Sequence, residues 1–290
     1  MTATTRDSID TLLATLKARL AEPGHSLIPL LGLMSRFPRY SFANQCLIYA
    51  QRPDATDVRG YRAWQKAGRQ VRKGEHGIAI YAPMRFKARY HESLDAPDTT
   101  DDGPTAPRVG FRVAYVFDVS QLEPSSTGDQ PIPADQPATT PTTAQRATEQ
   151  LKAFLFGHNV ELEYRPLPPG HYGYTDGRRI TCAAGQPIAV EFGTLVHETA
   201  HLLLHFPADG SPRPDLTTRE TEAEAVTYLL CARLGIDGTE ASIDYIRAYR
   251  GTPDTLESSL QRIRSIAERL ATELHAVTLD HPSAMLTDSN

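Results

Sequence analysis

The feature that most constrains this fold is the pentapeptide His197-Glu198-Thr199-Ala200-His201, which lies inside an apolar run that ends at His205. We expect this run to form a helix, near residues 189–205. Residues four apart share one face of a helix, so His197 and His201 direct their rings at one point. Glu198 lies beside them, close enough to hold a water molecule without being a ligand. The pattern indicates a zinc site of the kind that hydrolyses peptides, with Glu198 as the general base.

A catalytic zinc ion needs a third protein ligand as well as an open position. The segment 219–231 carries three carboxylates at helical spacing, Glu220, Glu222 and Glu224. We assign Glu224 as the third ligand and Glu220, one turn away on the same face, as an outer acceptor that orients a histidine ring. Glu222 points roughly 160° away from Glu224 and is expected to face solvent.

Other polar residues near the motif have weaker assignments. His205 lies one further turn along, about 12 Å from His197, which is too far to share the ion. We expect it to be an outer or helix-end histidine. Tyr172 and Tyr174 are candidates for a hydrogen bond to the oxyanion, although no spacing sets their distance from the ion. Two alternatives stay open: the histidines are ordinary core residues, or they hold a structural or relic zinc ion without peptidase activity.

Charge is unevenly distributed along the chain. The net charge is −5, but residues 34–90 contain twelve Lys and Arg against three acidic residues, a local balance of +9 that leaves −14 for the rest. Basic and aromatic residues interleave in this segment, as they do in proteins that hold phosphates with cations and stack bases on rings. The candidate contacts to nucleic acid are Arg59, Tyr61, Arg62, Trp64, Lys66, Arg69, Arg72 and Lys73. A buried aromatic core under a solvated basic face explains the same composition equally well.

Hydrophobic periodicity predicts an α+β protein of two domains. In the first half we expect helices near residues 9–20, 41–51 and 58–67 and strands at 78–81 and 109–117. In the second half we expect a strand at 160–164, a turn-rich stretch at 171–181, and helices near 144–156, 189–205, 218–234, 243–249 and 254–274. Residues 123–143 contain almost nothing apolar and predict a disordered linker. The expected division is a small mixed α/β domain over 1–122, the linker over 123–143, and a helix-rich domain with a small sheet over 144–290.

Nothing in the sequence predicts a membrane segment. The chain has no run of 18 apolar residues, and its first residues lack the basic and apolar stretches of a secretion signal, so we expect a cytoplasmic protein. Cys46, Cys182 and Cys231 lie far apart, which argues against a disulfide framework and against a thiolate metal site. The sequence carries no signal for an oligomeric state.

Three segments resemble the N-terminal domain of ArdC-type antirestriction proteins. They are residues 36–51, 60–80 and 114–121, and the most specific part is the core Trp64-x-x-x-Gly-x-x-Val-x-Lys-Gly-Glu75. The resemblance covers residues 30–122 and implies a domain that binds single-stranded DNA, followed by a zincin-like metallopeptidase domain. His197, Glu198, His201, His205 and Glu224 lie where the resemblance implies the peptidase motif. The same two helical segments also resemble the ImmA/IrrE regulator peptidases.

The resemblance further implies carriage on mobile elements and protection of incoming DNA from host restriction. Our leading hypothesis is a module that binds single-stranded DNA, tethered to a Zn²⁺-dependent peptidase whose substrate is an unidentified protein or peptide. One alternative is a protein that only shields single strands, with a zinc site that stabilises the fold. Another is a regulatory protease that cleaves a repressor and uses DNA only for location.

Overall fold

The computed structural model describes residues 3–22, 25–85, 109–124, 141–207, 210–236 and 253–274. Helices accompany two small three-stranded sheets, which confirms the predicted α+β class. Most of the predicted linker (125–140) and the predicted helix at 243–249 lie outside the described residues. Within the described part of the chain, no helix is both long enough and apolar enough to span a bilayer.

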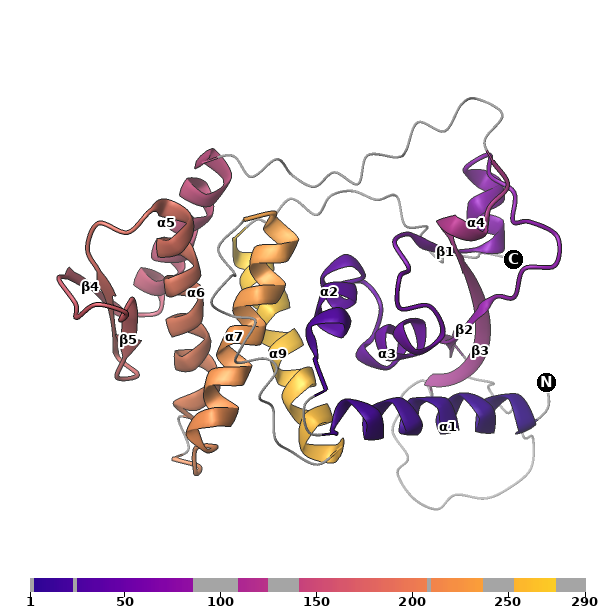
Figure 1. Ribbon diagram of the computed structural model, residues 1–290, viewed down its shortest axis with the longest axis horizontal. Coiled ribbons are helices and arrows are strands. Elements are labelled where there is room, and N and C mark those ends of the chain that lie inside the picture. The colour runs from indigo at the N-terminus through magenta and orange to yellow at the C-terminus, as the bar shows by residue number, and fades with distance from the viewer. Residues whose placement is uncertain are drawn as a thin grey trace, which may run out of the picture.

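The N-terminal part is an antiparallel sheet with helices against it (Figure 1). Strands β1 (Val58–Gly60), β2 (Ile78–Arg85) and β3 (Val109–Asp118) pair in the order β1-β3-β2. Apolar side chains on one face of the sheet pack on helices α2 (Ile28–Arg36) and α3 (Phe42–Gln51), and helix α1 (Ala3–Leu20) packs on the other face. The short helix α4 (Tyr61–Lys66) follows β1, and the 3-10 turn η1 (Val119–Gln121) follows β3.

Two side-chain amides of α3 cover the free edge of β2. The amide of Asn44 donates to the carbonyl of Tyr81 and accepts from its N–H, both at 2.9 Å. The amide of Gln51 does the same with Ala79, at 3.0 and 2.9 Å. Each amide reproduces the pair of hydrogen bonds that a neighbouring antiparallel strand would make. Helix α3 therefore occupies the place of a fourth strand.

The C-terminal part consists of long helices with a small mixed sheet on one side (Figure 1). Helices α6 (Ile188–His205), α7 (Leu216–Leu234) and α9 (Pro253–Glu273) pack together, and α5 (Pro141–Gly157) packs on α6. Strand β4 (Glu161–Arg165) runs parallel to β6 (Arg179–Ala183), and β5 (Gly173–Thr175) runs antiparallel to it. Both β5 and β6 contact α6, so the sheet lies against the helix that carries the histidines.

Both ends of α7 are set by local interactions. The Asp215 side chain accepts a hydrogen bond of 3.0 Å from the N–H of Thr218, which caps the first turn. Gly235 ends the helix in the left-handed conformation, with φ of 63°, where glycine is favoured. These caps determine where α7 places its three glutamates.

One hydrophobic core joins the two parts of the chain. Leu30 and Leu31 of α2 are fully buried in the same cluster as Val226 and Leu230 of α7, together with residues of α1, α5, α6 and α9. In Figure 1, α2 and α3 lie between the sheet β1-β3-β2 and helices α7 and α9. The predicted domain boundary between residues 122 and 144 stays a prediction, because the packing is continuous across it.

Three local expectations differ from the structure. Residues 58–67 were expected to form one helix, but Val58–Gly60 pair with β3 and only Tyr61–Lys66 are helical. The turn-rich stretch 171–181 contains β5 and the start of β6, because both strands find partners. Helix α2 was not among the predicted helices; Pro29 lies in its first turn, where a missing N–H costs nothing.

Candidate metal centre and nucleic-acid interface

Helix α6 brings two imidazole rings together on one face. His197 and His201 are one turn apart, and their Nε2 atoms lie 3.0 Å from each other. The helix is held against its neighbours by fully buried apolar side chains, namely Phe192, Leu195, Val196 and Ala200. Because this packing fixes the rotation of α6, both rings face α7.

Helix α7 adds a carboxylate to this pair. The Oε2 atom of Glu220 lies 3.4 Å from Nε2 of His197 and 3.4 Å from Nε2 of His201. Among the described residues, these three form the group of ligand atoms close enough to share one ion. A tetrahedral zinc ion with bonds of about 2.0–2.2 Å separates its ligand atoms by about 3.4 Å. The three atoms therefore have the spacing of a metal site.

Glu224 lies one turn beyond Glu220 and contacts the other side of a histidine ring. Its Oε1 atom is 3.4 Å from Nδ1 of His197. This position suits a carboxylate that accepts from the ring, the role that the sequence predicted for Glu220. The structure thus brings both predicted carboxylates to the histidines. Glu220, and not Glu224, is the one that lies near both Nε2 atoms.

Glu198 is buried beside the two histidines, with 6% of its surface exposed. Burial raises the pKa of its carboxyl above the usual range, an effect that the neighbouring Glu220 and Glu224 reinforce and the two histidines oppose. Gly173 of β5 lies directly against it. A Cβ at this position would be 2.7 Å from Cγ2 of Thr194 and 3.2 Å from Cγ of Glu198, so only glycine lets the strand approach.

A buried chain of hydrogen bonds connects His201 to α9. Nδ1 of His201 lies 3.0 Å from Nδ1 of His205, and Nε2 of His205 lies 3.0 Å from Oε2 of Glu222. The other carboxylate oxygen of Glu222 accepts from the hydroxyl of Ser259, at 2.5 Å, and from Arg262. If Nε2 of His201 faces a metal, its Nδ1–H donates to His205, whose Nε2–H donates to Glu222. The chain then fixes the tautomer that a ligand needs.

The expectation that Glu222 faces solvent is wrong, because its exposure is 0%. It does point away from Glu224, but that side of α7 is covered by α9. Nothing near Glu222 in the sequence reveals Ser259 and Arg262, which reach it from 37 and 40 residues away.

The pKa shifts of His197 and Glu220 favour an ion pair between these two side chains. Burial opposes charge on His197, but its hydrogen bond to Glu220 and the nearby carboxylates outweigh burial and raise its pKa. Burial also opposes charge on Glu220, yet its hydrogen bonds to the two histidines hold its pKa well below the usual range. For His205 burial prevails and lowers the pKa, so the neutral ring is favoured. A bound metal ion would take the place of the protons shared between these histidines and carboxylates.

The two tyrosines considered for the oxyanion are exposed residues on or beside β5. The hydroxyl of Tyr174 accepts a hydrogen bond from Arg165, whose guanidinium also lies 5.6 Å from the tyrosine ring. Tyr172 is more than half exposed. Their role in catalysis stays a prediction.

Two of the residues expected to contact nucleic acid are in the core of the N-terminal part. Trp64 is 1% exposed and donates its Nε1–H to the carbonyl of Phe117 at 2.8 Å. Arg59 is buried against it, 4.6 Å from the ring, and forms an ion pair of 2.6 Å with Asp57. The expectation that Arg59 and Trp64 contact nucleic acid is therefore corrected. Both side chains are buried and are occupied by the cation–π contact, the ion pair and the hydrogen bond described above.

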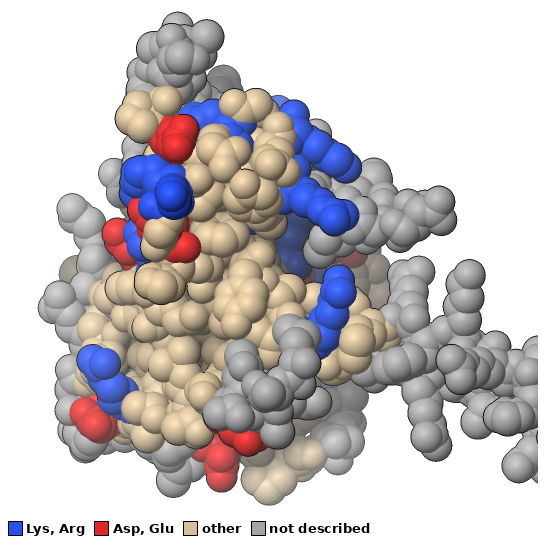
Figure 2. Space-filling model, turned by 90° about the vertical axis from the view of Figure 1, so that its right-hand side faces the viewer, with Lys and Arg blue, Asp and Glu red and all other residues tan. Residues whose placement is uncertain are grey.

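The other expected contacts lie at the surface. Tyr61, Arg62, Lys66, Arg72 and Lys73 are exposed and Arg69 is half-buried. Figure 2 shows Lys and Arg side chains on both sides of an uncharged area, at the end of the molecule that carries the sheet β1-β3-β2. This arrangement places cations around a surface that is not itself charged.

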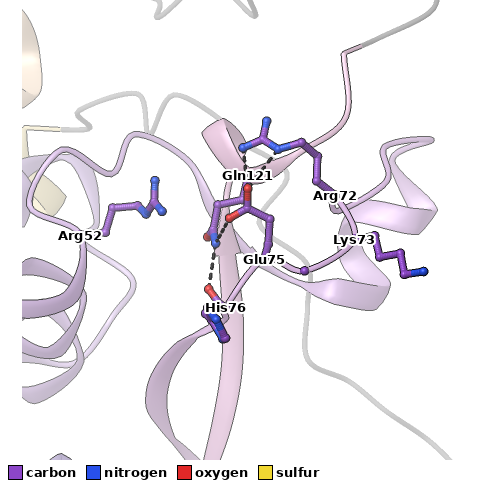
Figure 3. A pocket seen from close by; sticks show the side chains of 7 residues that line it. Arg52, Arg72, Lys73, Glu75, His76 and Gln121 are labelled. Carbon is purple, nitrogen blue, oxygen red and sulfur yellow. Dashed lines mark hydrogen bonds and ion pairs between the residues drawn. The ribbon is translucent and has the colours of Figure 1, made fainter.

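A basic hollow of about 370 Å³ lies beside this surface (Figure 3). At its centre Arg72 donates to Glu75 and to the carbonyls of Ser120 and Leu122, and Gln121 donates to the second oxygen of Glu75. These hydrogen bonds hold the pKa of Glu75 below its usual range. Arg52 and Lys73 lie on opposite sides of this network. Since Glu75 is already paired with Arg72, the hollow as a whole is positive.

Sequence reasoning missed exposed aromatic residues on β3. Phe111 and Tyr115 are 52% and 50% exposed, although the alternation of the strand had suggested that this face is buried. Only Val113, between them, is buried on that face. Alternating apolar and aromatic residues are compatible with a buried face and with an exposed aromatic surface.

Comparison with known proteins gives matches to both parts of the chain. Residues 6–117 match the family of the N-terminal domain of anti-restriction factor ArdC. The uncharacterized protein pXO2-81 of Bacillus anthracis is 23% identical over 309 residues, which include 94% of this chain and 51% of the relative. The chain thus spans about half the length of that relative.

Two solved structures are also similar. They are the Mn(II)-bound and metal-free crystal structures of the antirestriction ArdC protein from the R388 plasmid, each 18% identical, over 93% of this chain and 97% of theirs, with TM-scores of 0.48 and 0.47. The family match rests on the segment that contains α1 to β3, the sheet and the basic surface. The N-terminal part of this chain therefore resembles the N-terminal domain of anti-restriction factor ArdC.

Proposed function

We propose that this protein is a metal-dependent peptidase whose N-terminal domain binds single-stranded DNA. The observation that carries the proposal is the convergence of Nε2 of His197, Nε2 of His201 and Oε2 of Glu220 within 3.4 Å of one another, with Glu198 buried beside them. Two imidazoles and one carboxylate are a donor set that suits Zn²⁺ and leaves a position open. Glu220 would be the third ligand, and Glu224 the acceptor that orients His197.

A bound divalent ion would polarise a peptide carbonyl and make a water molecule more acidic. Glu198 would accept the proton of that water, a role supported by its buried position beside the two histidines. The same carboxyl can then deliver the proton to the departing amine.

The hypothesis of a metal-dependent peptidase is tested by removing and restoring metal. The purified chain is expected to contain about one equivalent of metal by elemental analysis, because one ligand group is formed among the described residues. Chelation should abolish cleavage of a mixed-sequence fluorogenic peptide library, and one equivalent of Zn²⁺ should restore it. Restoration of cleavage by Mn²⁺ should require a higher concentration of the ion, since sites of this kind hold Zn²⁺ more tightly than Mn²⁺. Cleavage that persists in the metal-free protein would contradict the proposal.

The DNA-binding part of the proposal is supported by the positive surface around the sheet. The residues of the ArdC N-terminal domain match carry the cations Arg62, Lys66 and Lys73 at the surface, and Tyr61 is exposed among them. Cations hold phosphates without sequence preference, and exposed rings interact with unpaired bases. We further propose that this binding serves protection of incoming DNA from restriction.

A competition experiment tests the DNA-binding proposal. Unlabelled single-stranded oligonucleotide is expected to displace a labelled strand at lower concentration than duplex of the same length, because bases in a duplex cannot stack on protein rings. Affinity should fall steeply with salt, as counterions are released on binding. Equal competition by single strand and duplex would contradict base stacking and would indicate only a general attraction to phosphates.

A further inference from the structure

We propose that Tyr61 and Tyr115, on either side of Phe117, form a platform on which bases of a single strand stack, while its phosphates lie over the adjoining basic hollow. The inference rests on the proposed binding of single-stranded DNA and assigns that binding to specific residues. The platform is defined by Tyr61, Phe117 and Tyr115, and the hollow is the one lined by Arg52, Arg72 and Lys73.

Two of the three rings lie on one face of the sheet, and the third belongs to α4 beside it. Phe117 and Tyr115 are two positions apart on β3 and therefore point to the same face. The ring of Tyr61 lies 6.2 Å from that of Phe117 at an angle of 67°, so the two rings meet edge to face. Gln70 donates a hydrogen bond of 2.9 Å to the hydroxyl of Tyr61 and holds this ring in place. Tyr61 and Tyr115 are 40% and 50% exposed, so each offers ring surface to a ligand.

The platform and the hollow meet at Gly77. A Cβ on this residue would be 2.8 Å from Cβ of Tyr115 and 3.1 Å from Cζ of Phe117, so the chain before β2 runs directly along the rings. His76, the preceding residue, lines the hollow together with Lys73. A base on Tyr115 is therefore next to the positive surface that would receive its phosphate.

Charge decides which occupant suits these exposed rings. Within the hollow, Glu75 is the one carboxylate of the lining, and both of its oxygens are taken by Arg72 and Gln121. Arg52 and Lys73 remain as an excess of positive charge on either side (Figure 3). A protein partner would cover the rings but would need its own acidic groups at both sides. A single strand supplies flat apolar bases and a regular series of anions along one chain.

The test compares variants of the full-length protein by fluorescence anisotropy with a labelled oligo-dT strand and with an abasic strand of the same length. Tyr115→Ala is expected to weaken binding of oligo-dT about tenfold, the usual effect of losing one stacked base. Tyr115→Phe should bind like the wild type, because it keeps the ring. Phe156→Ala is the matched control, since Phe156 is an exposed ring on α5, outside the platform. The abasic strand should bind Tyr115→Ala and wild type alike.

Lys73→Gln tests the hollow separately. It should weaken both strands and reduce the salt dependence by about one phosphate contact. The inference is overturned if wild type binds oligo-dT but Tyr115→Ala binds it within about twofold of wild type. It is overturned equally if Tyr115→Ala loses as much affinity for the abasic strand. If wild type binds neither strand, the proposed DNA-binding function itself fails.

Discussion

Replacement of Glu220 by alanine is expected to release the metal from the protein. Oε2 of Glu220 lies 3.4 Å from the Nε2 atoms of both His197 and His201, so its loss leaves two ligands where the site needs three. Loss of an outer partner costs about 10- to 100-fold in metal affinity, and loss of a ligand should cost more than that. The measurement is the dissociation constant for Zn²⁺ in competition with a chelator, with elemental analysis of the dialysed protein.

Glu224→Ala is the control, because Glu224 lies one turn along the same helix and contacts Nδ1 of His197. As an outer acceptor it should cost only about 10- to 100-fold. A larger loss of metal affinity in Glu224→Ala than in Glu220→Ala would contradict the proposal that Glu220 is the third ligand. It would favour Glu224, the ligand predicted from the sequence. Circular dichroism of both variants establishes that α7 is still folded.

Glu198→Gln is expected to lower peptide cleavage by about 10²- to 10⁴-fold, the contribution of a general base. The amide has nearly the same shape as the carboxyl but cannot take a proton from water. Metal content should not change, because Glu198 is not part of the ligand group. The measurements are cleavage rate and metal stoichiometry on the same preparation.

Glu149→Gln is the matched control for this variant. Glu149 is an exposed carboxylate on α5, paired only with Lys152 among the described interactions, and its change should leave cleavage as it is. Unchanged cleavage in Glu198→Gln would sink the peptidase mechanism. If cleavage is lost but protection of incoming DNA persists, the proposed binding of single-stranded DNA accounts for the protection. If comparison of cellular proteins shows one substrate that accumulates, a regulatory protease is favoured.

The part of the site that lies on one helix is accessible from the sequence. His197, Glu198 and His201 are within five residues, and their relation depends only on helical geometry and on the apolar residues that bury α6. Hydrophobic periodicity likewise predicted the α+β class, because it depends on residues that are close in the sequence. Where the position of a residue depends only on its own helix, the spacing of residues in the sequence is sufficient to predict it.

The roles of the three glutamates on α7 depend on contacts between helices. Helical spacing puts Glu220 and Glu224 on one face, but the relative position of α6 and α7 decides which carboxylate reaches both Nε2 atoms. The sequence predicted a surface position for Glu222, because Ser259 of the covering helix α9 comes 37 residues later. Such long-range packing leaves no trace in the spacing of the acidic residues.

The basic segment illustrates the same limit. Arg59 and Trp64 have the composition of a nucleic-acid surface, yet the pairing of β1 with β3 turns them inward, where Trp64 meets the carbonyl of Phe117. Composition alone therefore does not distinguish the residues that are buried in this segment from those at its surface.

The continuous core has a consequence for any attempt to study the two halves alone. A truncated N-terminal fragment would leave Leu30 and Leu31 without the α7 side chains that cover them, and a C-terminal fragment would lay bare Val226 and Leu230. Bare leucine and valine surfaces of this kind promote aggregation. Since α7 also carries Glu220, deletion of α2 would loosen the helix that positions this carboxylate. Loss of peptide cleavage in such a fragment would then report a disturbed scaffold and not a missing DNA ligand.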